Sequence, residues 1–257
     1  MIDVHCHLEQ KDYDNDRDDV IERCKKELKA IITSCAHPNY FDLTIKMVEK
    51  YKNFVFTTCS IHPEYVKEIS KNKIDDFIKL IKKNKDKIVG IGETGLDFWY
   101  IKEKSWREKQ KELFIKMINL AKELGKPIVI HSRNSEEDCI EILENNNAKN
   151  VLMHMFGANQ LTKRVIDNGW LISVNAIILM SKKHKKVVRD TPIEKLLLET
   201  DAPWLNPETL GKEIKKRNDS LTIKLVAEKI ADIKKTSFEQ VWNQCGKNAI
   251  NFFKLSI

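Results

Sequence analysis

Short runs of β-branched and other apolar residues alternate along the chain with longer stretches that are apolar on one face only. The short runs, bounded by polar segments, are typical of buried strands. They predict eight strands, over Ile2–His5, Ala30–Ser34, Phe54–Ser60, Ile88–Glu93, Ile128–His131, Val151–His154, Trp170–Val174 and Leu196–Asp201. The longer stretches repeat apolar residues every three or four positions, as amphipathic helices do. The clearest helical faces lie within residues 43–51, 77–81 and 113–121.

Repeated alternation of strand and helix over one short chain predicts an α/β fold of the (β/α)₈ or TIM-barrel type. The alternative is an open doubly wound sheet, which usually carries a glycine-rich phosphate loop after its first strand. Here the first strand instead runs into the sequence His5-Cys6-His7-Leu8-Glu9. Because we find no linker, repeat or low-complexity segment, we expect a single domain over residues 1–257.

Several residues mark expected helix ends. Gly125, followed by Pro127, is expected to end the long helix before the fifth strand. Ser220 and Ser237 are the expected N-caps of two C-terminal helices.

Composition limits the partners and the cellular compartment that we expect for the protein. The net charge of +7 favours anionic partners such as nucleic acid, although lysine-rich stretches are also typical of solvated helix faces. The six cysteines form no CxxC pair, so we expect them to be reduced in a cytoplasmic protein. No apolar run approaches the roughly 18–20 residues that span a bilayer, and no signal peptide is evident, so we expect no membrane partner. Nothing in the sequence implies an obligate protein partner.

The first strand ends in the pair His5 and His7. In an extended strand, alternate side chains point to the same face, so the two imidazoles project together and offer two nitrogen ligands to a metal. A His-x-His pair alone is equally compatible with two surface histidines that bind no metal. Its interpretation depends on whether other strands supply further ligands.

Candidate ligands follow the apolar run of five predicted strands, at the carboxyl end of each. In a TIM barrel these ends share one face, which holds the active site. Four imidazoles and two carboxylates suit a divalent ion such as Zn²⁺ or Mn²⁺, and they exceed what one tetrahedral ion needs. We therefore predict two metal ions bridged by Glu93, with the ligands His5, His7, Glu93, His131, His154 and Asp201.

These segments together resemble the TatD family of metal-dependent deoxyribonucleases, which belong to the amidohydrolase-like barrels. The similarity covers essentially the whole chain, and its motifs are specific in combination and order. They are Asp3-Val4-His5-Cys6-His7-Leu8, Ser60-Ile61-His62-Pro63, Gly92-Glu93-Thr94-Gly95-Leu96-Asp97, Val129-Ile130-His131-Ser132-Arg133 and Glu199-Thr200-Asp201-Ala202-Pro203-Trp204.

The resemblance implies a first metal held by His5, His7, Glu93 and Asp201, and a second held by Glu93, His131 and His154. The ions expected are Zn²⁺, Mn²⁺ or Mg²⁺. It also implies DNA as substrate, with hydrolysis of phosphodiester bonds from the 3′ end of single strands.

The sequence departs from the family pattern in two places. The family usually has His-Cys-Phe-Ser-Gly after the sixth strand, where this chain has His154-Met155-Phe156-Gly157-Ala158. A hydroxyl that could line the phosphate pocket is therefore missing. The family often has Asn-Glu-Pro near the last helices, where this chain has Asn218-Asp219-Ser220. Both departures affect the expected substrate contacts more than the metal ligands.

For the reaction we expect an in-line attack of hydroxide on phosphorus, with Asp201 as proton acceptor and Glu93 between the metals. Arg133 is the expected partner of a phosphate oxygen, with a surface ion pair as its alternative. His62 is expected to contact the substrate phosphate or a metal-bound group, or to be a structural turn residue. Glu199 and Asp97 are expected to fix the orientation of metal ligands. The aromatic residues Trp99, Tyr100 and Trp204 are expected either to stack on the bases or to pack against the barrel.

Two other functions fit part of the pattern. An amidohydrolase acting on a C–N or ester bond of a small molecule often bridges its metals with a carboxylated lysine, whereas this chain has Glu93 at that strand. A non-catalytic binding module would be expected to lack a metal ligand or Asp201, and none is missing.

Overall fold

Eight parallel strands form one sheet in the computed structural model, which describes residues 1–257. Each strand is hydrogen-bonded to the next in chain order, from the first to the eighth. This order excludes a doubly wound sheet, in which the strand order reverses. The strands are β1 (Ile2–Cys6), β2 (Ala30–Cys35), β3 (Val55–Cys59), β4 (Gly90–Asp97), β5 (Ile128–Arg133), β6 (Val151–Met153), β7 (Leu171–Val174) and β8 (Leu196–Leu198).

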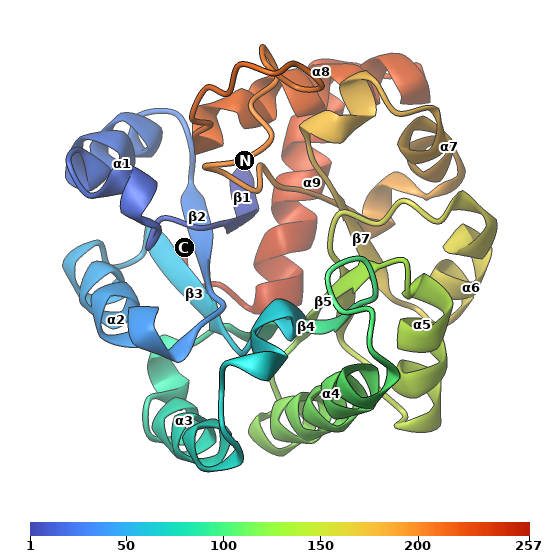
Figure 1. Cartoon of the computed structure of the whole chain (residues 1–257). Helices are drawn as coiled ribbons and strands as arrows, with labels where there is room; N and C mark the ends of the chain where they lie inside the picture. The colour runs from blue at the N-terminus through green and yellow to red at the C-terminus, as the bar shows by residue number, and fades with distance from the viewer.

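Helices follow the strands and surround the sheet in chain order (Figure 1). The last of them packs beside β8 and β1. The arrangement confirms the predicted TIM barrel. The helices are α1 (Arg17–Lys25), α2 (Phe41–Lys50), α3 (Lys71–Lys83), α4 (Lys104–Leu124), α5 (Glu136–Asn145), α6 (Thr162–Asp167), α7 (Lys182–Asp190), α8 (Ile223–Lys234) and α9 (Phe238–Phe253).

The first strand and the segment after the last strand meet through backbone hydrogen bonds. The Asp201 amide donates to the His5 carbonyl at 2.9 Å, and the His7 amide donates to the Ala202 carbonyl at 2.7 Å. These bonds bring the two ends of the sheet together at the carboxyl ends of the strands. They also fix Asp201 next to the His5 and His7 pair.

The interior of the barrel is filled at its amino end. Ile2, Val4 and Ile32 form a buried apolar cluster there, and Phe253 and Leu255 from the C-terminal segment complete it. Each of these side chains is less than one-tenth exposed.

The predicted strands all exist, and most of their ends differ from the prediction by two residues or fewer, but the carboxyl ends of two strands differ by three or more. β4 continues to Asp97, so Glu93 lies inside the strand, and β8 stops at Leu198, so Asp201 lies in the following loop. The strands end where their ladder hydrogen bonds end, and this depends on the neighbouring strand as well as on local apolarity.

The helix-end predictions were largely correct. α4 ends at a left-handed Gly125, and Ser237 accepts a hydrogen bond from the Gln240 amide at the start of α9. Ser220 was the wrong cap. Asp219 accepts from the Leu221 amide instead, because the chain first forms a 3₁₀ turn before α8 begins.

Two further sequence-based points can be compared with the structure. All six cysteines are free and buried, as expected for reduced thiols. Among the helices, none has both the length and the apolar character needed to cross a bilayer.

Gly95 allows β4 and β5 to approach closely beside the site. A Cβ at this position would lie 2.0 Å from the carbonyl oxygen of His131, and the backbone has φ +145°. We expect Gly95→Ala to reduce the free energy of unfolding in urea by about 3 kcal/mol, since both overpacking and strain oppose it. Gly169→Ala is the control: it meets no atom within 4 Å, so only its φ of +78° opposes it, at about 1 kcal/mol. If the free energy of unfolding fell equally in both variants, close packing at Gly95 would not be the cause.

Candidate metal centre

Two register shifts direct side chains of the first and fourth strands into the barrel. The pairing of β1 with β2 shifts between Asp3 and Cys6, and that of β4 with β5 shifts between Ile91 and Thr94. An extra residue in one strand re-aims the side chains beside it, and such bulges are common next to active sites. His5 and Glu93 lie at these two shifts, and both face the interior, where they meet.

Four predicted ligands form a first group of donor atoms. His5 Nε2 lies 3.1 Å from His7 Nε2 and 3.2 Å from Glu93 Oε2. Asp201 Oδ1 lies 3.6 Å from His7 Nε2 and 3.8 Å from His5 Nε2. Donor atoms around a tetrahedral ion at about 2.0–2.2 Å are about 3.3 Å apart. The spacing of this group therefore fits one divalent ion.

The other oxygen of Glu93 belongs to a second group. Oε1 lies 2.7 Å from His131 Nδ1, 3.5 Å from His62 Nε2 and 3.6 Å from His154 Nε2. The structure thus brings all six predicted ligands together and adds His62 to them. His154 contacts both groups, because its ring also lies 3.9 Å from that of His5.

Each of three histidines contacts a buried carboxylate through its other ring nitrogen. Such contacts fix the ring orientation of metal-binding histidines. His131 Nε2 lies 2.9 Å from Asp97 and His154 Nδ1 lies 2.8 Å from Glu199, so both predicted orienting contacts are present.

The third contact was missed by sequence reasoning. His7 Nδ1 lies 3.0 Å from Glu9, which in turn accepts a hydrogen bond from Thr33. The signal was available, since Glu9 continues the alternate spacing of His5 and His7.

Burial and charge act against each other in this cluster. Burial alone would raise the pKa of Glu93, but the surrounding imidazoles, above all His154, hold it well below its usual range. Burial alone would lower the pKa of His131, but hydrogen bonds to Asp97 and Glu93 raise it to about 9. At His5, burial and then the charge of His154 lower the pKa. The centre is an ionised carboxylate among imidazoles, a donor set that suits a divalent cation.

The loop after β8 is held in place by buried polar contacts. Asp3 accepts hydrogen bonds from the amide and hydroxyl of Thr200, at 3.1 and 2.5 Å. Asp201 follows with φ +56°, a conformation that aspartate tolerates better than most residues. Together with the backbone bonds to β1, these contacts place the Asp201 carboxylate over the two histidines.

Comparison with known proteins agrees with this geometry. The family described as TatD related DNase matches residues 2–254 of the chain. The chain belongs to the TatD family of metal-dependent hydrolases. It is 37% identical to a metal-dependent hydrolase of Methanocaldococcus jannaschii, over 98% of this chain and 96% of the relative. It is 32% identical to the deoxyribonuclease TATDN3 of Homo sapiens, over 98% of this chain and 94% of that protein.

A solved structure supports the same membership. The crystal structure of a TatD-family hydrolase from Entamoeba histolytica superposes with a TM-score of 0.88 and 25% sequence identity. The superposition covers 98% of this chain and 97% of that one. The TatD barrel therefore accounts for nearly the whole chain.

The candidate metal-binding side chains of this TatD protein open into a cavity of about 640 Å³ at the carboxyl end of the barrel. Three aromatic side chains at its mouth are about half exposed: Trp99 (51%), Tyr100 (57%) and Trp204 (47%). They are therefore not buried packing residues. Arg133 forms no ion pair, and its guanidinium lies 5.2 Å from the ring centres of both Trp99 and Tyr100. The mouth combines a free cation with exposed aromatic faces.

The departure from the TatD pattern near the last helices has a structural explanation. Asn218 is fully buried; its amide donates to the Thr200 carbonyl, and its side-chain oxygen accepts from the Thr222 hydroxyl. Asp219 caps the following turn and does not line the cavity. Asn218 therefore supports the loop that carries Asp201, while the shortened acid Asp219 only caps the next turn.

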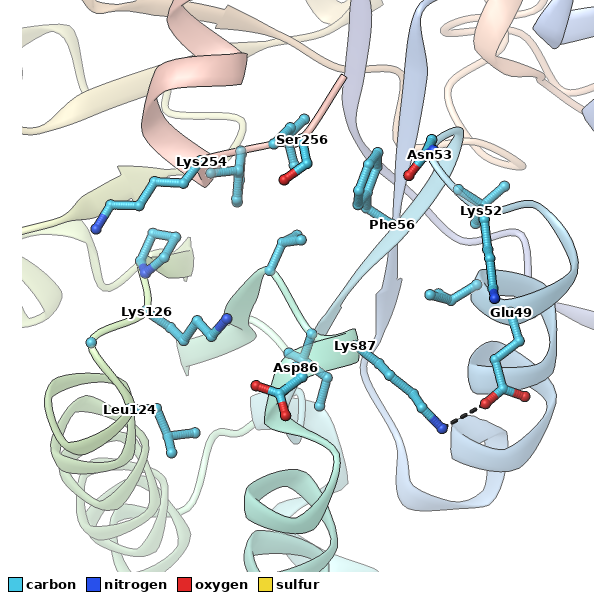
Figure 2. A pocket seen from close by; sticks show the side chains of 18 residues that line it. Glu49, Lys52, Asn53, Phe56, Asp86, Lys87, Leu124, Lys126, Lys254 and Ser256 are labelled. Atoms are coloured by element: carbon cyan, nitrogen blue, oxygen red, sulfur yellow. Dashed lines mark hydrogen bonds and ion pairs between the residues drawn. The ribbon is translucent and has the colours of Figure 1, made fainter.

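The other large cavity of this TatD barrel, about 740 Å³, lies at the opposite end, before β3, β4 and β5 (Figure 2). Figure 2 shows Lys126 directed into it and the ion pair between Lys87 and Glu49. None of its lining residues is a histidine or a cysteine, and none belongs to a candidate metal group. The candidate site is therefore the cavity at the carboxyl end.

Proposed function

We propose that this TatD-family hydrolase is a two-metal deoxyribonuclease that removes nucleotides from the 3′ end of single-stranded DNA. One observation carries the proposal: the two oxygens of Glu93 face different groups of histidine ligands. A carboxylate in this position suits a bridge between two ions. We further propose that residues 1–257 act as one domain.

The first ion would be held by His5, His7, Glu93 and Asp201, and the second by Glu93, His131 and His154. Divalent ions bound there would activate water near neutral pH and neutralise phosphate charge. The mixed nitrogen and oxygen donors suit Zn²⁺ or Mn²⁺, and Mg²⁺ is the third candidate.

The remaining steps are assigned to side chains of the chain itself. Asp201, whose side chain is 16% exposed toward the cavity, would orient the attacking water and accept its proton. Arg133 would pair with a non-bridging phosphate oxygen through its planar guanidinium. His62, beside Glu93, would donate a hydrogen bond to the phosphate or to a group held there. The aromatic mouth would stack the bases of a single strand.

The decisive test is digestion of single-stranded DNA labelled at its 5′ end, with Mn²⁺, Mg²⁺ or Zn²⁺ and with EDTA. We expect a ladder of progressively shorter labelled products that requires metal. An amide and lactone panel tests the amidohydrolase alternative on the same preparation. Cleavage of that panel without any cleavage of DNA would overturn the proposal.

Trp99→Ala is expected to raise KM for single-stranded DNA about tenfold with little change in kcat, since a base stacked on an aromatic ring contributes about 1–3 kcal/mol. Steady-state kinetics on oligonucleotides measures this. Trp106→Ala, on α4 and outside the cavity, is the matched control. If Trp99→Ala left KM unchanged, the mouth would not be a stacking surface.

A further inference from the structure

At Gly157, where the chain departs from the family pattern after the sixth strand, another side chain fills the space. A Cβ on Gly157 would lie 2.4 Å from Nε2 and 2.7 Å from Cε1 of His184. No side chain fits at residue 157 while the imidazole stays in place. His184 therefore occupies the space that a serine at this position would use.

His184 lines the cavity, and neighbouring groups hold its ring in place. It lies in the first turn of α7, is only 5% exposed, and its Nδ1 is 2.7 Å from the Ser181 hydroxyl. The ring also forms a hydrogen bond with the backbone of Met155. Lys183, which forms no ion pair, lines the same cavity.

The imidazole is neutral near pH 7. Burial, followed by the charge of Lys183, lowers the pKa of His184 to about 4. When the Ser181 hydroxyl donates to Nδ1, the ring hydrogen lies on Nε2. The nitrogen beside Gly157 is then a hydrogen-bond donor at the wall of the cavity that contains the candidate metal centre.

We propose that His184 binds a phosphoryl oxygen of the substrate, in the place where the family pattern supplies a hydroxyl at residue 157. Lys183 contributes positive charge to the same subsite. The inference rests on the proposed phosphodiester hydrolysis, and it assigns a specificity-determining residue that lies outside the metal ligands.

The test uses the Mn²⁺-loaded protein and calorimetric titration with thymidine 5′-phosphate, with thymidine as the probe that lacks phosphate. His184→Ala is expected to weaken binding of thymidine 5′-phosphate roughly 10- to 100-fold, the effect of losing a hydrogen bond to a charged group. Binding of thymidine should not change. His184→Gln, which keeps an amide donor and a larger side chain, is expected to lose less.

The double variant tests whether both residues serve one subsite. Gly157→Ser alone is expected to weaken binding, because it displaces the imidazole. Gly157→Ser combined with His184→Ala should recover to within about threefold of wild type, since the hydroxyl then has the space. His37→Ala, a histidine outside the cavity, is the matched control.

Three outcomes would overturn the inference. The first is a wild-type protein that does not bind thymidine 5′-phosphate. The second is a His184→Ala variant with a lower melting temperature but unchanged binding, which would leave His184 as a loop support. The third is a double variant no better than His184→Ala. His184-dependent binding in a protein that cuts no DNA would instead overturn only the proposed nuclease function.

Discussion

Asp201→Asn is expected to lower kcat for DNA hydrolysis about 10³-fold, within the range assigned to general acid–base groups. The amide has nearly the same shape as the carboxylate and keeps an oxygen toward His5 and His7. It cannot accept a proton from the attacking water. The loss therefore falls on turnover, at about 4 kcal/mol of activation free energy, while metal content stays at two ions.

Single-turnover kinetics and elemental analysis of the same preparation separate these effects. Asp167→Asn, in α6 and 59% exposed, is the matched control and should resemble wild type. An Asp201→Asn protein that holds two ions and retains near wild-type turnover would show that another group takes the proton.

Glu93→Gln is expected to remove both ions and with them all measurable hydrolysis. The carboxylate is only 3% exposed and is the one group whose oxygens face both sets of histidines. Gln keeps the shape but loses the charge that holds the cations and balances the imidazoles. Because breaking a buried ion pair by removing one partner costs about 3–5 kcal/mol, the free energy of unfolding should also fall by several kcal/mol.

Elemental analysis, DNA digestion and urea unfolding measure the three consequences of Glu93→Gln. His131→Ala is the comparison, since His131 contacts only the second group and its loss should leave one ion bound. Two ions retained in His131→Ala would refute the ligand assignment. Two ions retained in Glu93→Gln alone would refute only the bridge.

Much of this site follows from sequence because strand order and residue type are local properties. Eight apolar runs separated by helical patterns leave few topologies in which every strand is buried on both faces. Histidines and acids that follow those runs must then share one end of the barrel. This reasoning holds for His131, two residues before the carboxyl end of β5, and for His154, directly after β6.

The same reasoning was insufficient where geometry departs from simple alternation. Glu93 lies inside β4, and Val4 and His5 are neighbours that both face the interior. A bulge explains each case, and bulges depend on how two strands pair. The space at Gly157 is likewise filled by His184, which is 27 positions away in the sequence and reaches it only through the packing of α7.

By itself, the sequence determined the barrel, the order of its strands and the candidate metal-binding side chains. Hydrophobic periodicity and the chemistry of possible ligands can be recognised in the local sequence, without knowledge of contacts between distant segments. Only the tertiary structure decided where those side chains point, which acids orient them and which residue replaces the missing hydroxyl. These features arise from strand register, backbone closure and packing between distant segments, and such contacts exist only once the chain has folded.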